Sequence, residues 1–161
     1  MTSSSRILVL MVVAVIVVLA VYTVDQATSI PGAVTTGVPS SFTVNGRTYI
    51  FTYIATDEAQ REAGLMNKKV GINTTMLFAF PRFDYWQFWM YDTNASLDMI
   101  WVNATGNSGR VVYLVTSAQP CFDSASCQRY TPTSQADYVI EAKAGFAAAN
   151  SVEVGTTIQL A

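Results

Sequence analysis

Apolar residues along the chain form one long unbroken run, followed by a series of short runs. Residues 7–24, ILVLMVVAVIVVLAVYTV, contain no charge, glycine or proline, and a run of this length can cross a bilayer as a helix. Residues 26–40 are rich in Thr, Ser, Gly and Pro and show no periodicity, which is typical of a flexible tether. The pattern therefore predicts an N-terminal transmembrane anchor over residues 1–25, a tether over residues 26–40 and a folded domain over residues 41–161.

The folded domain begins with a hairpin and a short helix. Two β-type runs within residues 42–54 surround Asn45-Gly46, a pair that accepts the positive φ angles of a type I′ turn. Residues 57–63 then predict an amphipathic helix. Thr56 or Asp57 can cap its first turn, and Gly64 can end it.

The later apolar runs predict a strand-rich domain. We expect the run at residues 76–80 to be a buried strand that ends at Pro81. We expect a turn or short helix at residues 145–150. The fold class is α+β: a compact, largely antiparallel curled sheet or small barrel with one or two short helices, preceded by a single transmembrane helix. Further strands are expected at residues 86–91, 97–102, 110–115, 138–142 and 157–160.

The residues flanking the long apolar run predict its orientation. Arg6 precedes the run and Asp25 closes it, so the positive-inside tendency places the N-terminus in the cytoplasm and the domain outside the cell. A cleaved signal peptide is the alternative, but its apolar core is shorter and a small-x-small site follows it. We therefore expect a signal anchor in the cell membrane of an archaeon or bacterium, with residues 7–24 contacting the lipid bilayer.

Composition removes several classes of function. The chain has 161 residues and a formal net charge of −2, with 12% charged and 51% apolar residues. No basic run is present, which argues against a nucleic-acid partner. Because the chain has no histidine, Ser-His-Asp and Cys-His nucleophiles and imidazole metal sites are excluded. We predict neither a cofactor nor a metal site.

Two cysteines, Cys121 and Cys127, flank five other residues. In an oxidising compartment they fit one short structural disulfide that holds a loop. A redox pair would more typically be spaced as Cys-x-x-Cys, so the spacing favours the structural role.

The densest stretch, residues 76–102, combines three apolar runs with an acidic, polar end. Its aromatic and methionine side chains are favoured as core, because large rings and flexible thioethers fill small cores. Within residues 86–91, alternation would place Gln87, Trp89 and Tyr91 on a second apolar face. Either the helix predicted at residues 57–63 or a ligand would cover that face.

Carboxylates supply the remaining candidate chemistry. Asp92 and Asp98 lie six residues apart in the sequence, and across a turn they could converge for acid–base work. They could equally accept hydrogen bonds from turn amides or pair with a nearby Lys or Arg. A hard-cation site is a further alternative, but the spacing is not that of an EF-hand.

Several motifs in order resemble one family. Gly64-Leu65-Met66, residues 76–80 (MLFAF), residues 88–93 (FWMYDT) and Leu97-Asp98 are similar to the run GLM…MLFxF…FWMxNT…PLD of the domain of unknown function 192 family. The residues from Tyr138 to Gly145 resemble its yVLExxAG motif. The resemblance implies a small, mixed α/β, barrel-like domain and supplies no activity. The chain departs from the pattern at Asp92, where the family has Asn, and at Ser96, where it has Pro.

We therefore interpret the chain as a membrane-anchored extracytoplasmic domain that binds a ligand or protein partner. Binding is favoured over enzymatic activity. A small hydrolase using Asp92 and Asp98 is one alternative, and an accessory structural subunit of a membrane complex is another. The predicted binding residues are Lys68, Trp89, Asp92, Thr93, Asp98 and Glu141.

Overall fold

The computed structural model describes residues 37–161. The predicted anchor over residues 1–25 and the tether up to residue 36 lie outside the described residues. Within residues 37–161, no helix is long and apolar enough to cross a membrane.

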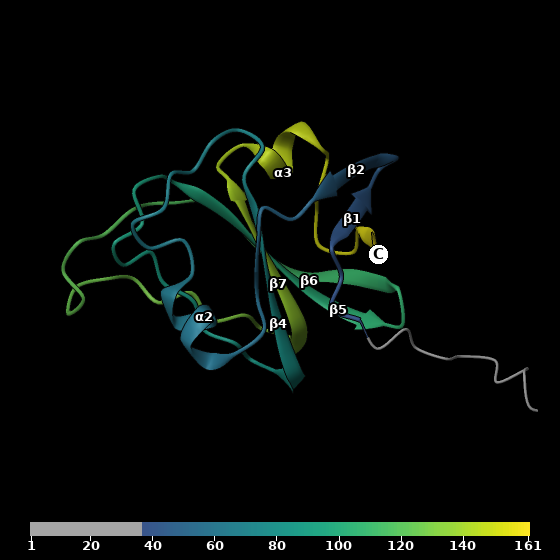
Figure 1. Ribbon diagram of the computed structural model, residues 1–161, viewed down its shortest axis with the longest axis horizontal. Helices are drawn as coiled ribbons and strands as arrows, with labels where there is room; N and C mark the ends of the chain where they lie inside the picture. Colours follow the sequence, from purple (N-terminus) through teal and green to yellow (C-terminus); the bar gives the residue numbers. More distant parts are fainter. Residues whose placement is uncertain (1–36) are drawn as a thin grey trace, which may run out of the picture. The chain divides into compact units, whose positions relative to one another are not determined.

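Eight strands form a single sheet in the order β2-β1-β8-β6-β5-β7-β4-β3 (Figure 1). All neighbours pair antiparallel except β3 and β4, which are parallel. This confirms the largely antiparallel α+β class. The strands are β1 (Ser41–Val44), β2 (Arg47–Ile50), β3 (Tyr53–Ala55), β4 (Thr75–Asp84), β5 (Leu97–Thr105), β6 (Ser108–Ala118), β7 (Ala136–Lys143) and β8 (Thr157–Leu160), and the helices are α2 (Glu58–Ala63) and α3 (Phe146–Ala149).

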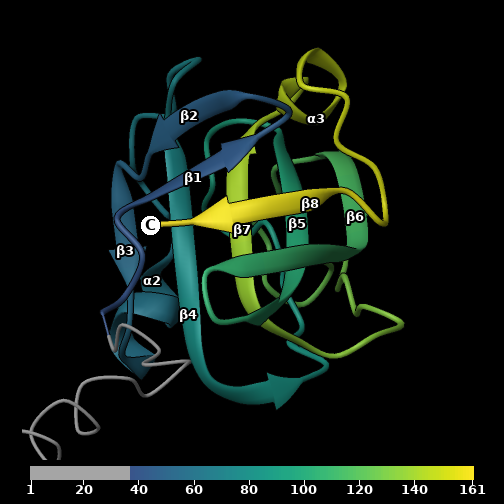
Figure 2. The same ribbon diagram turned by 90° about the vertical axis from the view of Figure 1, so that its right-hand side faces the viewer.

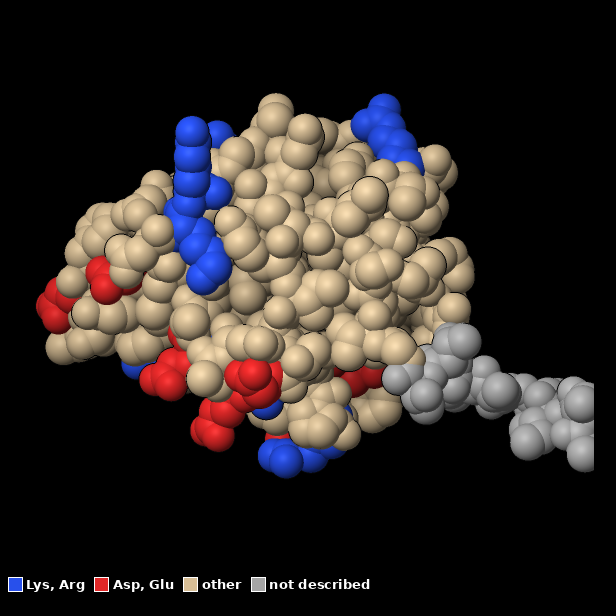
Figure 3. All heavy atoms as spheres, in the orientation of Figure 1, with Lys and Arg blue, Asp and Glu red and all other residues tan. Residues whose placement is uncertain are grey.

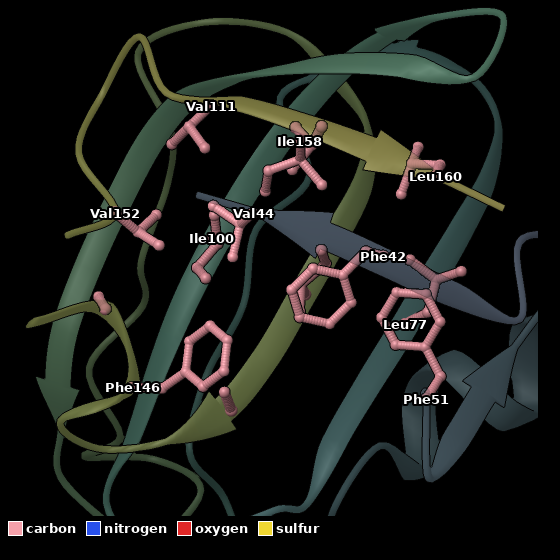
Figure 4. Close-up of a cluster of buried hydrophobic side chains, with 14 of the residues drawn as sticks. Phe42, Val44, Phe51, Leu77, Ile100, Val111, Phe146, Val152, Ile158 and Leu160 are labelled. Atoms are coloured by element: carbon pink, nitrogen blue, oxygen red, sulfur yellow. The ribbon is translucent and has the colours of Figure 1, made fainter. Parts of the chain in front are cut away.

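The sheet curls so that its β1 and β8 end lies over its centre. Figure 2 shows β8 crossing in front of β7 and β5, with β1 beside it. The curl encloses a first core, in which Phe42 of β1 and Ile158 of β8 pack against Leu77 and Ile100 of the central strands. Side chains from these strands and Phe146 of α3 converge in this core (Figure 4).

A second core lies on the other face of the central strands. Successive side chains on a strand point to opposite faces, so Ile100 joins the first core while Met99 and Trp101 join the second. The second core is completed by Leu65, which follows α2, and by Phe88 from the segment between β4 and β5. The central strands are therefore covered on both faces, which explains why nearly all of β5 is buried.

The local elements at the start of the domain follow the sequence closely. Asn45 and Gly46 have φ angles of 48° and 78° and connect β1 to β2, as expected for a type I′ turn. Asp57 caps α2 by accepting a hydrogen bond from the Gln60 N–H, and Gly64 ends the helix at a φ of 44°. The predicted hairpin and helix are both confirmed.

Three details of the strand assignment were wrong. The hairpin does not include all of residues 42–54, because β3 lies apart from β2 and pairs with β4. β4 continues through Pro81 to Asp84. The ladder between β4 and β7 is irregular between Ala79 and Asp84, so the missing N–H of Pro81 removes no regular hydrogen bond.

The third error concerns residues 86–91, which were predicted to form a strand. They run extended outside the sheet and make only isolated bridges, from Phe88 to Tyr130 and from Tyr91 to Cys121. The predicted alternation still holds, since Phe88 and Met90 are buried while Gln87 is exposed and Trp89 is half-buried. The segment therefore forms an outer wall over the second core.

Candidate functional site

A pocket of about 170 Å³ opens between α2 and residues 86–93. A wider and shallower groove of about 520 Å³ shares five of its lining residues and adds Ala59 and Ser124. We call the pocket and this groove together the cleft. The pocket is lined by Arg61, Glu62, Ala63, Gly64, Leu65, Met66, Phe78, Phe80, Trp86, Gln87, Phe88, Trp89, Tyr91, Thr93 and Glu141.

Glu141 is the buried acid of this pocket. It lies in β7 between Met76 of β4 and Met99 of β5, and only 4% of it is exposed. Its carboxyl group makes no hydrogen bond or ion pair with the described residues, and because no fully buried side-chain oxygen among these residues lacks a partner, its oxygens are open to the pocket. Burial raises its pKa to about 8, since an apolar environment disfavours the charged form.

Aromatic rings form much of the pocket wall. Trp86 stacks on Phe80 with ring centroids 4.1 Å apart. Phe88 meets Phe78 edge to face at 4.8 Å. The Arg129 guanidinium lies 3.6 Å from the centroid of the Trp89 ring, a geometry that stabilises the position of this ring by a cation–π interaction.

Helix α2 forms the opposite wall and buries none of its residues. Its exposed Ala59 and Ala63 line the cleft, so the helix borders the cleft and does not fill it. Arg61 fixes the helix to the sheet, because its Nη1 donates to the backbone oxygens of Thr56 at 2.7 Å and Ala79 at 3.0 Å.

The loop between β6 and β7 holds the outer wall in place. Cys121 and Cys127 form a disulfide within it. The Cys121 N–H donates to the Met90 oxygen, and the Asp92 N–H donates to the Cys121 oxygen. The loop, green in Figure 1, extends toward the side of the sheet where α2 lies, and its Ser124 reaches the groove.

The structure brings three of the predicted binding residues to the cleft and leaves three away from it. Trp89, Thr93 and Glu141 line the pocket, whereas Lys68, Asp92 and Asp98 do not. The Lys68 ammonium lies 5.6 Å from the centroid of the Tyr53 ring.

Asp92 occupies a left-handed turn position with a φ of 49°. Its N–H bonds Cys121, and its backbone oxygen accepts from the Asn67 N–H. Both Asn and Asp tolerate this conformation better than other residues with a side chain. The exchange of the family's Asn for Asp92 is therefore compatible with the backbone that the position requires.

Asp98 is engaged on the other face of the sheet. Its Oδ1 accepts from the Ser117 N–H at 2.8 Å, and its Oδ2 accepts from the N–H groups of Gly145 at 3.0 Å and Ala147 at 2.8 Å. The carboxylate thus ties β6 and the start of α3 to β5. Asp92 and Asp98 do not converge on the cleft, because Asp98 points toward α3.

The sequence predicted that either the helix at residues 57–63 or a ligand would cover the face of Gln87, Trp89 and Tyr91, and α2 does lie across the cleft from Trp89 and Tyr91. The individual residues of the helix and of the turn that follows it were not among the predicted binding residues. Arg61, Gly64 and Met66 line the pocket. The two exposed alanines on α2 were the available signal, since small residues on the inner side of a helix leave room. Among residues 37–161, no three His, Cys, Asp or Glu side chains are grouped as metal ligands would be.

The fold and the cleft define a small curled-sheet domain with a pocket that holds several aromatic side chains and a buried acid. The chain belongs to the family of the domain of unknown function 192 (DUF192), described as an uncharacterized ACR, which matches residues 41–160. This confirms the family indicated by the sequence motifs. No relative was found among curated proteins.

Solved structures share the fold. One is described as a candidate transcription regulator from Sinorhizobium meliloti 1021; it is 26% identical, with a TM-score of 0.62, and the match covers 74% of this chain and 90% of that one. Another is a protein of unknown function from Novosphingobium aromaticivorans, 23% identical with a TM-score of 0.62 over 82% of this chain and 94% of that one. The match to the Novosphingobium protein supports the fold only.

Proposed function

We propose that the domain is a binding module for a small organic ligand, which enters the cleft between α2 and residues 86–93 and is anchored by Glu141. The observation that carries the proposal is the carboxyl of Glu141, without a protein partner, in a pocket to which six aromatic side chains contribute. Small-molecule sites have this composition, an apolar concavity with few polar groups that orient the ligand.

The energetic cost of Glu141 supports a functional role. Burying an ionisable carboxyl without a cationic partner costs free energy, and the raised pKa of Glu141 reflects this cost. Its place in β7 is flanked by Met76 and Met99, so an apolar residue would suit the packing better. Strongly shifted acids inside clefts are candidates for functional sites on the same grounds.

The walls of the cleft are suited to a preformed site. Arg61 holds α2 against β4, and the disulfide-containing loop holds residues 90–92 by backbone hydrogen bonds. A preformed site loses less conformational entropy on binding. The shallower groove beside the pocket has room for the rest of a larger ligand.

Binding is favoured over hydrolysis by Asp92 and Asp98. A pair of acids must converge on the reacting bond to act as acid and base, and Asp98 already accepts three backbone hydrogen bonds on the far side of β5. Neither of the two acids lines the pocket. The role of an accessory structural subunit stays a prediction that depends on residues 7–24.

We also propose that residues 7–24 anchor the domain at the outer side of the cell membrane, where the Cys121–Cys127 disulfide would be stable. Transcriptional regulation, as in the description of the Sinorhizobium protein, has little support. The chain has a net charge of −2, and the lysines and arginines on the face in Figure 3 do not gather into one patch.

The test uses the full chain in lipid nanodiscs, screened against small metabolites by tryptophan fluorescence. We expect a saturable signal that is lost in Glu141→Leu and Trp89→Ala. The matched control is Phe83→Ala, which removes a partly exposed ring outside the pocket lining and should bind normally. A ligand whose binding survives both cleft substitutions would disprove the proposal, as would a screen without any ligand.

A further inference from the structure

We propose that the ligand group received by the pocket is a primary alkylammonium, which forms an ion pair with the Glu141 carboxylate while its methylene chain lies against the aromatic wall. This inference rests on the proposed binding function and names its ligand class. Three features of the pocket carry it: its charges, its rings and its size.

The ionisable groups of the pocket leave Glu141 without a compensating cation. Three other titratable side chains line the pocket: Arg61, Glu62 and Tyr91. The Arg61 guanidinium is already bound to two backbone oxygens and lies 5.2 Å from the centroid of the Phe80 ring. Glu62 is exposed and adds a second acid at the edge. An anionic ligand would find no unengaged cation here, whereas an ammonium group can pair with the carboxylate of Glu141 and is attracted by Glu62.

Groups outside the pocket do not alter this balance. Lys68 lies over the Tyr53 ring, and Lys143, the next same-face position of β7, is exposed and lines a different cavity. The β4 and β5 neighbours of Glu141 are the uncharged Met76 and Met99. A ligand ammonium would therefore be the first cation to pair with this carboxyl.

The rings beside Glu141 favour a cation over a polyhydroxylated ligand. Phe78, Phe88, Trp89 and Tyr91 all line the pocket. Ring faces attract ammonium groups, but they offer few hydrogen bonds to hydroxyl groups. The Thr93 hydroxyl already donates to the Tyr91 oxygen at 3.4 Å. A sugar would therefore leave most of its polar groups unpaired.

The size of the pocket matches a short amine chain. Its volume of about 170 Å³ is similar to that of an apolar cavity of about 150 Å³ that binds benzene. A chain of four or five carbons with a terminal ammonium is of this size. The same group occurs in free diamines and in lysine side chains, and the adjoining groove could receive the remainder of either.

The pairing predicts that binding releases a proton. Because burial raises the pKa of Glu141 to about 8, the free protein holds this carboxyl mostly protonated near neutral pH, whereas the ion pair requires the carboxylate. Alkylammonium groups stay protonated up to about pH 10. Affinity should therefore rise about tenfold per pH unit below pH 7 and level off above pH 8. A neutral ligand that accepts a hydrogen bond from the protonated acid would show the opposite trend.

The experiment compares three probes of the same shape, n-pentylamine, n-pentanol and pentanoate. Each is titrated by calorimetry against the full chain in phosphatidylcholine nanodiscs at pH 6, 7 and 8, with empty nanodiscs subtracted. We expect pentylamine to bind at least about tenfold more tightly than the other two, with the pH trend given above. Glu141→Gln should lose both the affinity and the trend. Glu153→Gln, an exposed acid outside the pocket, should retain both.

The outcomes separate this inference from the proposed function. If pentanol or pentanoate binds as tightly as pentylamine, or if Glu141→Gln keeps the amine affinity, the ammonium proposal is overturned. If that binding is nevertheless lost in Trp89→Ala, the proposed binding function stands. If no probe binds at any pH, the ammonium proposal fails, and the metabolite screen decides the binding function independently.

A second arm identifies the source of the ammonium. It compares 1,5-diaminopentane with a lysine residue blocked at both ends as an amide. Tighter binding of the diamine supports a free amine, and tighter binding of blocked lysine supports a polypeptide side chain. Failure of both to bind overturns the proposal.

Discussion

Two buried acids in adjacent strands have opposite surroundings. Asp98 of β5 is 1% exposed and Glu141 of β7 is 4% exposed, and they occupy neighbouring rungs, where Asp98 pairs with Ala142 and Met99 pairs with Glu141. Because successive side chains alternate in direction, Asp98 points toward α3 and Glu141 toward α2. Asp98 accepts three backbone hydrogen bonds, whereas Glu141 accepts none from the described residues.

The comparison shows that burial alone does not define the role of an acid. Asp98 satisfies N–H groups in β6 and at the start of α3, groups that would otherwise be unpaired, so its charge supports the fold. Glu141 lies in the pocket lining without a partner in the protein. The free-energy cost of burying its carboxyl group therefore serves a role other than stabilising the fold. Four changes would sharpen or break this contrast.

Replacing Asp98, the hydrogen-bonded acid, should have the largest effect on stability. Asp98→Ala removes the acceptor of three N–H groups, those of Ser117, Gly145 and Ala147, and we expect a loss of about 4 kcal/mol in the free energy of unfolding. Urea unfolding of the full chain followed by near-UV circular dichroism measures it. Asp98→Asn keeps one acceptor oxygen and should lose about half as much. A loss under about 1 kcal/mol for the alanine variant would refute a structural role.

Replacing Glu141, the acid without a partner, should instead raise stability. Burial raises the pKa of Glu141 in the folded state to about 8, above the ordinary glutamate pKa of 4.5 that applies to the unfolded chain. Stability is therefore greatest below the unfolded value and is lost as pH rises through 8. Glu141→Gln removes this loss, so we expect a gain of about 1 kcal/mol at pH 5 and about 4 kcal/mol at pH 8. Urea unfolding at the two pH values checks it, and an equal effect at both would contradict the unpaired carboxyl.

Removing the disulfide should affect the α2 side of the sheet more than the α3 side. Closing a loop of this length contributes about 2 kcal/mol, so Cys121→Ser with Cys127→Ser should lower the free energy of unfolding by about that amount. Hydrogen exchange should rise at residues 88–92, which bond to this loop, and stay unchanged in α3. Reduction of the wild-type chain is the matched control. Equal exchange on both sides would show that the loop does not hold the outer wall.

The smallest effect concerns the ring at the edge of the cleft. Arg129 lies over the Trp89 ring, and a contact of this kind contributes about 0.5–1 kcal/mol at exposed sites. Arg129→Ala should cost that much and broaden the tryptophan emission. Arg129→Lys should recover part of it. An unaltered emission spectrum would mean that the guanidinium does not fix the ring.

Several local elements could be predicted from the residues themselves. The turn at Asn45-Gly46, the cap at Asp57 and the helix end at Gly64 follow from backbone preferences that act within a few residues. The alternation of residues 86–91 also held, although their pairing did not. Which strand neighbours which depends on contacts between distant residues, so β3 beside β4 and the release of residues 86–91 from the sheet were not predictable by pattern.

The candidate site was likewise predictable from the sequence only in part. The sequence predicted Trp89, Thr93 and Glu141 to be binding residues, a role that stays a prediction, and the structure places all three in the pocket lining. It grouped them with Asp92 and Asp98, because nothing in the sequence shows which face a buried acid will point to or which backbone groups will reach it. The helix at residues 57–63 was one of two candidates to cover the Trp89 face, but which of its residues line the cleft was not predictable, since the helix becomes part of a cleft only when the chain folds back over β4.

By itself, the sequence therefore determined the family, the strand-rich class, the turns and the cysteine pair, all of which arise from short-range preferences and ordered motifs. Only the tertiary structure decided the difference between the two acids. Adjacent rungs of one sheet put them on opposite faces, and hydrogen-bond donors from β6 and α3 reach Asp98 but not Glu141. A carboxyl group's role depends on whether its charge is compensated, and that compensation comes from residues far away in the chain.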